Sequence, residues 1–387
     1  MPELSSAAHR VYGEAAFDVL AKARALEAQG RKVLHFEIGE PDMETPEPIA
    51  QAGIRAIRNK QTHYVSPVGL EVLRSAVAEE VHRTRGYRPD TDQIIITPGL
   101  KPGIFFTMLA ALDPGDEVIF PDPAYPTYGS VTAMTNAVPV PVPLREENEF
   151  RMDPDDVAAR ITHKTKLLVI NSPQNPTGSV MTEDELAAIA KLAEKHDFFV
   201  MSDEIYSKMV YDGPMAPSIT IHDQARERTL LLDGFSKIYA MTGWRLGYMV
   251  VPKPMAQRMW DYMVSAVSCT PAFTQLAGVE ALTGDQSFIA DVLARFDAKR
   301  RRIVEGLNQV PGISCTMPRG AFYAFPNIKD TGMTSRECAD FILDKAGVAV
   351  VPGSAFGDAG EGYLRFSYAT EMDVIDEAIE KMKLAFK

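Results

Sequence analysis

Cysteine is scarce in this 387-residue sequence, and its three cysteines, Cys269, Cys315 and Cys338, are far apart and form no Cys-x-x-Cys pair. This spacing excludes a disulfide framework and a zinc-finger site, and it is typical of proteins from a reducing cytosol. None of the seven histidines stands at a His-x-His or His-x-x-x-His spacing, so the sequence offers no ligand set for a metal. We therefore expect no metal centre.

An excess of positive charge and a long apolar run are also missing. The chain has 40 basic and 52 acidic side chains, for a net charge of −12, which argues against nucleic acid or a membrane surface as a partner. No apolar run approaches the roughly 18 residues that span a bilayer. The N-terminus mixes charges among its apolar residues, unlike a signal peptide. We expect a soluble, cytoplasmic protein.

Between residues 50 and 285, apolar segments of strand length alternate with helical segments. The strand candidates are DQIIITPG, DEVIFP, TKLLVINSP, FFVMSDEIY, TLLLDGFSK and WRLGYMVV. Several are nearly continuous apolar runs, which is typical of strands covered by helices on both faces. Between two of them, Thr182 and Glu185 form a capping-box pattern at the start of a helix. The alternation predicts an α/β fold with a mostly parallel sheet flanked by helices.

A long helix is predicted within residues 286–310, and it marks the end of this region. We interpret its Lys-Arg-Arg-Arg run (299–302) as a solvated helix face. Beyond it, SCTMPRGAFYAFP, VAVVPGSAFG and YLRFSYA are typical of antiparallel strands framed by helices. A chain of this length is long for one hydrophobic core. We therefore predict a large domain over residues 46–285 and a smaller α+β domain from residues 1–45 and 286–387.

Polar residues follow the predicted strands at the point where each strand ends. The segments are TPGLKPG (97–103), PDPAYPTY (121–128), NSPQNPTG (171–178), SDEIY (202–206) and GFSK (234–237). Each of them alone has an ordinary structural explanation, such as a turn or a helix cap. Because open α/β sheets bind ligands at the carboxyl ends of their strands, the set as a whole predicts a binding site there.

Several motifs together resemble those of a known family. EIGEPD, HYVSPVGLEVLR, NPTG, SDEIY, SKIYAMTGWRLGY and LRFSYA resemble, in this order, the signatures of pyridoxal-phosphate (PLP) aminotransferases of the aspartate aminotransferase fold, in classes I and II. The sequence is most similar to the bacterial subgroup that contains aspartate, aromatic and alanine aminotransferases. The resemblance implies PLP as the cofactor and the fold called type I among PLP enzymes.

The resemblance also implies a role for each residue around the cofactor ring. Lys237 would form the Schiff base with the PLP aldehyde and later move the proton from the substrate α-carbon to the cofactor. Asp203 would pair with the pyridine nitrogen, because a nearby carboxylate favours the cationic ring. Asn175 and Tyr206 would bind the ring's 3′-oxygen, and Tyr125 would stack on the ring face.

A second group of residues would bind the cofactor phosphate. Ser236 can donate a hydroxyl hydrogen bond, and Arg245 can donate a charge-assisted fork. Backbone N–H groups at the start of a helix would complete the anion site, and they belong to Gly99, Leu100 and Lys101.

One further residue, Tyr64, implies that two copies of the chain assemble. Tyr64 resembles the tyrosine that reaches the phosphate from the neighbouring subunit of the family's dimers. We therefore expect a homodimer with a shared active site.

The substrate must present an α-carboxylate, and Arg365 resembles the family's bidentate clamp for it. Gly39 and Asn175 would add smaller contacts, and Lys101 is the candidate to face the second carboxylate of a dicarboxylic amino acid. We expect an aminotransferase that moves the amino group of an L-amino acid, with aspartate favoured, to a 2-oxo acid such as 2-oxoglutarate. The resemblance implies a ping-pong mechanism.

Other functions stay open at this stage. An aromatic side-chain pocket lined by Tyr12, Phe17 and Tyr323 would favour an aromatic aminotransferase, and alanine is a third substrate. The same residues also serve carbon–sulfur β-lyases, in which proton abstraction leads to elimination. A non-enzymatic regulator with an aminotransferase-like domain is disfavoured, because the chain is acidic and starts almost directly at the family's first helix.

Overall fold

The computed structural model describes residues 2–5 and 8–387 of the chain. Its largest sheet has seven strands in the order β2-β8-β7-β6-β5-β3-β4. They are β2 (Ile94–Thr97), β3 (Glu117–Asp122), β4 (Val138–Pro143), β5 (Thr165–Asn171), β6 (Phe199–Asp203), β7 (Thr229–Gly234) and β8 (Gly247–Val250). Neighbouring strands are parallel except at β8, which is antiparallel to both β2 and β7. The predicted α/β fold with a mostly parallel sheet is confirmed.

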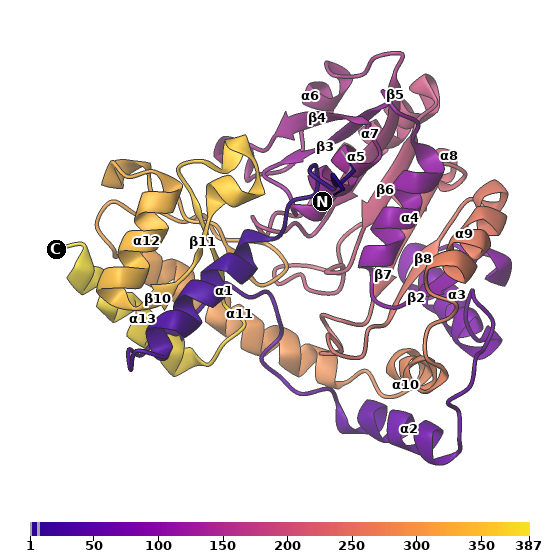
Figure 1. Cartoon of the computed structure of the whole chain (residues 1–387), viewed down its shortest axis with the longest axis horizontal. Helices are drawn as coiled ribbons and strands as arrows, with labels where there is room; N and C mark the ends of the chain where they lie inside the picture. The colour runs from indigo at the N-terminus through magenta and orange to yellow at the C-terminus, as the bar shows by residue number, and fades with distance from the viewer. Residues whose placement is uncertain (1, 6–7) are drawn as a thin grey trace.

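Helices surround this sheet and form much of the rest of the molecule (Figure 1). They are α1 (Ala15–Glu27), α2 (Glu47–Arg58), α3 (Glu71–Arg85), α4 (Lys101–Ala111), α5 (Thr127–Met134), α6 (Pro154–Ala158), α7 (Glu183–His196), α8 (Asp223–Arg226), α9 (Lys253–Ala266), α10 (Ala272–Thr283), α11 (Phe288–Leu307), α12 (Ser335–Ala346) and α13 (Met372–Ala385). Within the described residues, none of them combines the length and the apolarity that crossing a membrane requires.

The large sheet is buried on both faces, as its apolar strands predict. In β5, Leu167 and Val169 belong to the core that packs against α4, whereas Leu168 and Ile170 belong to the core that packs against α7. Successive side chains of a strand point to opposite faces, so a strand between two helical layers must be apolar throughout.

The helix α7 begins at the predicted capping box. The Thr182 hydroxyl accepts a hydrogen bond from the Glu185 N–H, and the Glu185 carboxylate accepts one from the Thr182 N–H at 2.8 Å. Two N–H groups that the first helical turn leaves without partners are satisfied in this way.

A smaller group of strands forms from the chain after residue 310. The strands β11 (Val351–Pro352), β12 (Leu364–Ser367) and β9 (Tyr323–Ala324) pair in that order and are antiparallel, as predicted. β1 (Leu34–His35) pairs in parallel with β10 (Val348–Ala349), which joins the N-terminal part of the chain to the C-terminal part. Figure 1 shows α12 and α13 beside these strands, with α11 running from them toward α10.

The sequence pattern does not predict the strand β4, whose sequence is VPVPVP. Proline has no N–H to donate, so three prolines argue against a central strand. The structure places β4 at the edge of the sheet, where β3 is its partner. At an edge, the N–H groups on one side of a strand need no partner, and the prolines are therefore tolerated.

The interpretation of the Lys-Arg-Arg-Arg run as a solvated face is wrong for its first two residues. Lys299 and Arg300 on α11 are buried. Lys299 forms an ion pair with Asp42, and Arg300 donates to Asp212 at 2.6 and 2.9 Å. Buried charges are stable only when they are paired, and the partners come from distant segments that helical periodicity does not reveal. These pairs fasten α11 to the turn that follows β1, through Asp42, and to the loop that follows β6, through Asp212.

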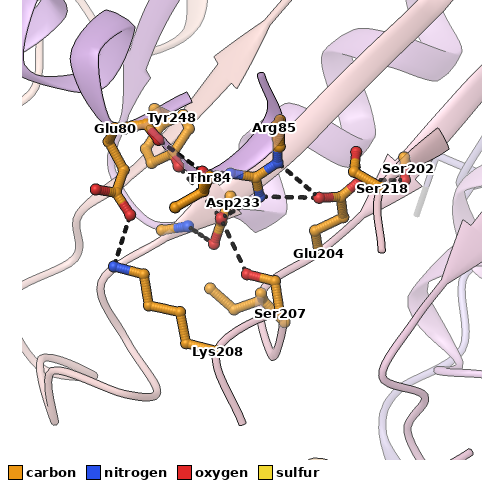
Figure 2. Close-up of polar contacts among 12 residues, drawn as sticks. Glu80, Thr84, Arg85, Ser202, Glu204, Ser207, Lys208, Ser218, Asp233 and Tyr248 are labelled. Atoms are coloured by element: carbon orange, nitrogen blue, oxygen red, sulfur yellow. Dashed lines mark hydrogen bonds and ion pairs between the residues drawn. The ribbon is translucent and has the colours of Figure 1, made fainter. Parts of the chain in front are cut away.

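A buried ion cluster ties α3 to the carboxyl ends of β6 and β7 (Figure 2). The Arg85 guanidinium donates to the Glu204 carboxylate at 2.9 Å and to the Asp233 carboxylate at 2.7 Å. Burial raises the pKa of Glu204, and the positive charge of Arg85 opposes that rise. Glu204 directly follows Asp203, and Asp233 stands four residues before Lys237. The cluster therefore fixes the two strand ends that present the candidate catalytic side chains.

Candidate active site

A cavity of about 370 Å³ opens at the carboxyl ends of β5, β6 and β7. Most of the predicted site residues line it: Gly39, Leu100, Lys101, Tyr125, Asn175, Asp203, Tyr206, Ser236, Lys237, Arg245 and Arg365. Gly99 and Tyr64 are not among the lining residues. The fold thus brings residues from both ends of the chain to one site.

Asp203, at the end of β6, is a buried carboxylate without a cationic partner among the described residues. Its carboxylate accepts hydrogen bonds from the Tyr128 hydroxyl at 2.6 Å and from the Ile205 N–H at 3.3 Å. Burial raises the pKa of Asp203 to about 6 despite these hydrogen bonds. A carboxylate in this state favours any cation placed against it in the cavity.

Lys237 follows β7 and points its amine at the opposite wall. Its Nζ donates to the Gly39 carbonyl at 2.6 Å and lies 5.6 Å from the centre of the Tyr206 ring. Burial, together with the positive charge of Arg365, lowers the pKa of Lys237 to about 8. The amine therefore has a larger neutral fraction near neutral pH than an ordinary lysine, and the neutral form is the one that acts as a nucleophile or a base.

Ser236 and Arg245 form another part of the cavity wall. Arg245 has a positive φ of 53°, and its Nη1 donates to the Thr242 carbonyl at 2.8 Å. The other side of this guanidinium packs so closely on Gly99 that a Cβ there would lie 2.1 Å from Nη2. Gly99 is thus required for the approach of Arg245, although it does not line the cavity. The α4 helix begins here, with Leu100 as its N-cap.

Arg365, on β12, is a buried cation with no carboxylate within ion-pair distance in the described chain. Its Nη1 donates to the Asn175 side-chain carbonyl at 3.3 Å, and its Nη2 donates to the Glu37 carbonyl. Its Nε has no hydrogen-bond partner within the part of the chain that the structure describes. The guanidinium also lies 4.9 Å from the centre of the Tyr323 ring. Because an unpaired buried charge is costly, this arrangement favours a bound anion.

Sequence reasoning gave no role to eight of the lining residues. Three of these have polar side chains that hydrogen-bond to other lining residues: Glu14, Tyr128 and Asn171. Tyr128 was detectable, since it stands three residues after Tyr125 at a helix start, and such spacing puts two side chains on one face. Asn171 ends β5 within a segment that the sequence pattern does single out, and its side chain donates to the Asp203 carbonyl at 3.1 Å. Nothing in the sequence connects Glu14 to this site.

The aromatic residues considered for a side-chain pocket divide into two groups. Phe17 and Tyr323 line the cavity, and the Tyr323 hydroxyl is 2.7 Å from the Tyr206 hydroxyl. Tyr12 is half exposed and does not line the cavity, so the expectation that it lines the side-chain pocket is wrong. Its backbone instead lies against α5, 3.4 Å from the Ser130 hydroxyl.

The buried carboxylate of Asp203 should lower the free energy of unfolding of the cofactor-free protein, by an amount that depends on pH. The folded pKa, about 6, exceeds the unfolded value of 3.8, so the cost is absent below the unfolded value and develops as the pH rises through the folded value. Asp203→Asn removes it and should raise the free energy of unfolding at pH 7.5 by up to about 3 kcal/mol. Urea denaturation should show a smaller gain at pH 5, and a gain independent of pH would contradict this cause.

Known proteins share both the sequence and the fold of this chain. The family model described as "Aminotransferase class I and II" matches residues 31–382. An aspartate aminotransferase of Pyrococcus abyssi is 41% identical over 360 residues, 92% of each chain. The aromatic-amino-acid aminotransferase 2 of Thermococcus litoralis is 40% identical over 93% of each chain.

A solved structure shows the same likeness in three dimensions. The aspartate aminotransferase from Thermus thermophilus with maleate superposes with a TM-score of 0.95 at 36% identity, and the alignment covers 100% of both chains. The family match spans nearly the whole chain, and the identities well exceed those at which only a fold is shared. The chain therefore belongs to the class I and II aminotransferases and is a transaminase.

Proposed function

We propose that this transaminase uses PLP to move the amino group of an L-amino acid, with L-aspartate favoured, to a 2-oxo acid such as 2-oxoglutarate, in two half-reactions of a ping-pong cycle. One observation carries the proposal. The cavity places together a buried carboxylate (Asp203), an amine of lowered pKa (Lys237) and a buried guanidinium (Arg365), and none of the three has a side-chain partner of opposite charge among the described residues.

The residues at the site fit PLP, which has an aldehyde, a pyridine nitrogen and a phosphate. Asp203 would hold the protonated ring nitrogen, and the Lys237 amine would hold the aldehyde covalently. Arg245 has no carboxylate partner in the described chain, and with Ser236 and the start of α4 it would bind the phosphate. Tyr125 would cover one face of the ring.

PLP supplies, when bound, the electron-withdrawing ring that no side chain can replace. The chain supplies the remaining chemistry. Once the substrate amine has displaced it from the aldehyde, the Lys237 amine would be the base that removes the proton from the substrate α-carbon, and its lowered pKa of about 8 increases its neutral fraction. Asp203 would favour the protonated form of the ring nitrogen. The Asn175 and Tyr206 side chains would donate hydrogen bonds to the ring's 3′-oxygen.

The substrate's α-carboxylate would bind Arg365, with Asn175 and the Gly39 backbone beside it. Lys101 lies on the cavity wall and would face the second carboxylate of aspartate. The relatives named aspartate aminotransferase support this substrate, and the relative named aromatic-amino-acid aminotransferase supports the second candidate. Phe17 and Tyr323 on the lining also favour the aromatic alternative.

We propose that residues 46–285 form a large PLP-binding domain and that residues 1–45 and 286–387 form a smaller one. The parallel pair β1–β10 and a small core around Ala23, Val33, Leu343 and Ala349 support the second grouping. The free cysteines are compatible with the cytoplasm, and cell fractionation would test that location.

We propose that two such chains form a dimer whose sites each take Tyr64 from the neighbouring subunit. Tyr64 is 87% exposed and lies outside the cavity lining of its own chain, so a second copy is the partner that gives it a role. Sedimentation equilibrium at micromolar concentration should report twice the chain mass. A monomer that keeps full activity would contradict the shared site.

The substitution Arg365→Lys tests the substrate clamp. Lysine keeps the charge but loses the bidentate geometry, so the apparent affinity for the amino acid should fall by about 10- to 100-fold. The visible spectrum of bound PLP should stay unchanged. Titration of both proteins with amino acid, followed by absorbance, gives both quantities. Arg319→Lys, at an exposed arginine that pairs with Glu149, is the control. Loss of PLP from Arg365→Lys would show that this residue has another role.

A further inference from the structure

Residues 8–14, the segment before α1, pack against α5, a helix that flanks the large sheet. The Arg10 Nε donates to the Ala133 carbonyl at 2.8 Å, and the Ser130 hydroxyl donates to the Tyr12 carbonyl at 3.3 Å. Both contacts lie on α5 (Thr127–Met134), and Tyr125 stands just before the N-terminal end of this helix. These contacts hold the last residue of the segment, Glu14, at the wall of the active-site cavity.

Glu14 stands at the N-cap position of α1, but its side chain makes no hydrogen bond to the helix. The carboxylate turns into the cavity instead. One of its oxygens, Oε1, accepts a hydrogen bond from the Tyr125 hydroxyl at 2.8 Å and forms an ion pair with the Lys101 ammonium. Glutamate is not a usual capping residue, and the contacts of Glu14 with two lining residues of the cavity point instead to a role in the site.

We propose that Glu14 is an exchangeable counter-ion for Lys101: the second carboxylate of an acidic substrate replaces it, and an aromatic side chain leaves it in place. The proposal rests on the function proposed above, in which Lys101 faces the substrate side chain. It assigns to Glu14 the selection between two classes of substrate in one cavity.

Charge balance explains why an internal carboxylate is useful here. An ammonium next to an aromatic substrate would face apolar surface without a counter-ion, which is costly. With Glu14 in contact, Lys101 is neutralised whenever no acidic substrate is bound. The Lys101 and Glu14 side chains are 46% and 23% exposed, and ion pairs at such exposure contribute only about 1 kcal/mol or less. A substrate carboxylate can therefore replace Glu14 at little cost, because the released carboxylate reaches water.

The substitution Glu14→Gln tests the exchange, because glutamine keeps the size and a hydrogen-bonding oxygen but removes the charge. The probes are two unreactive acids, maleate with two carboxylates and 3-phenylpropionate with one carboxylate and an aromatic ring. Calorimetric titration of the PLP-loaded protein gives their dissociation constants without turnover. The Kd of maleate should fall roughly fivefold in the variant, whereas the Kd of 3-phenylpropionate should not fall.

Two further variants separate this cause from others. Asp18→Asn removes a carboxylate from the exposed first turn of α1 and should change neither Kd. In a Lys101→Gln background, Glu14→Gln should have a clearly smaller effect on maleate, because the competition for the ammonium is gone.

The proposal is overturned if Glu14→Gln changes the Kd of both acids by the same factor or does not lower the Kd of maleate. It is also overturned if Glu14→Gln lowers the Kd of maleate just as much in the Lys101→Gln background. A failure of the proposed transaminase function would be recognised separately. In that case the PLP-loaded wild-type protein would transfer no amino group from either aspartate or phenylalanine, whatever the two acids do in the binding assay.

Discussion

The geometry of the site depends on the buried guanidinium of Arg85, which is paired with Glu204 and Asp233. Burying three charges is costly, and such a cluster is stable only when its geometry leaves each charge with a partner. The cluster fixes the carboxyl ends of β6 and β7 against α3 (Figure 2). Asp203 directly precedes Glu204, and Lys237 follows Asp233 by four residues, so the anchored strand ends set the directions of both side chains into the cavity before any ligand binds.

The active-site charges contrast with this satisfied cluster. Asp203, Lys237 and Arg365 lie in the cavity, and burial raises the pKa of Asp203 and lowers that of Lys237. Burying these charges without partners of opposite sign among the described residues lowers the stability of the fold. A cofactor with a cationic ring and a substrate with a carboxylate would supply such partners. The same physical reason, an unfavourable lone charge, explains why Glu14 lies against Lys101 in the cavity.

The sequence was sufficient to predict where the strands end and which polar residues follow them, because apolar runs and polar turns are local patterns. It predicted the parallel sheet and the capping box at Thr182, and eleven of the residues it assigned to cofactor or substrate line the cavity. It failed where a role depends on a distant partner. The burial of Lys299 depends on Asp42, the place of Glu14 depends on Lys101, and β4 is a strand only because it lies at the sheet edge. None of these pairings leaves a periodic signal in the chain.

The most direct test of the account is the absorption spectrum of the PLP-loaded protein before and after addition of L-aspartate, with no 2-oxo acid present. Without an acceptor, only the first half-reaction can occur. The account predicts that the visible band of bound PLP gives way to the near-ultraviolet band of pyridoxamine phosphate. A visible band that persists with L-aspartate and also with L-phenylalanine would contradict the proposed amino-group transfer at this site.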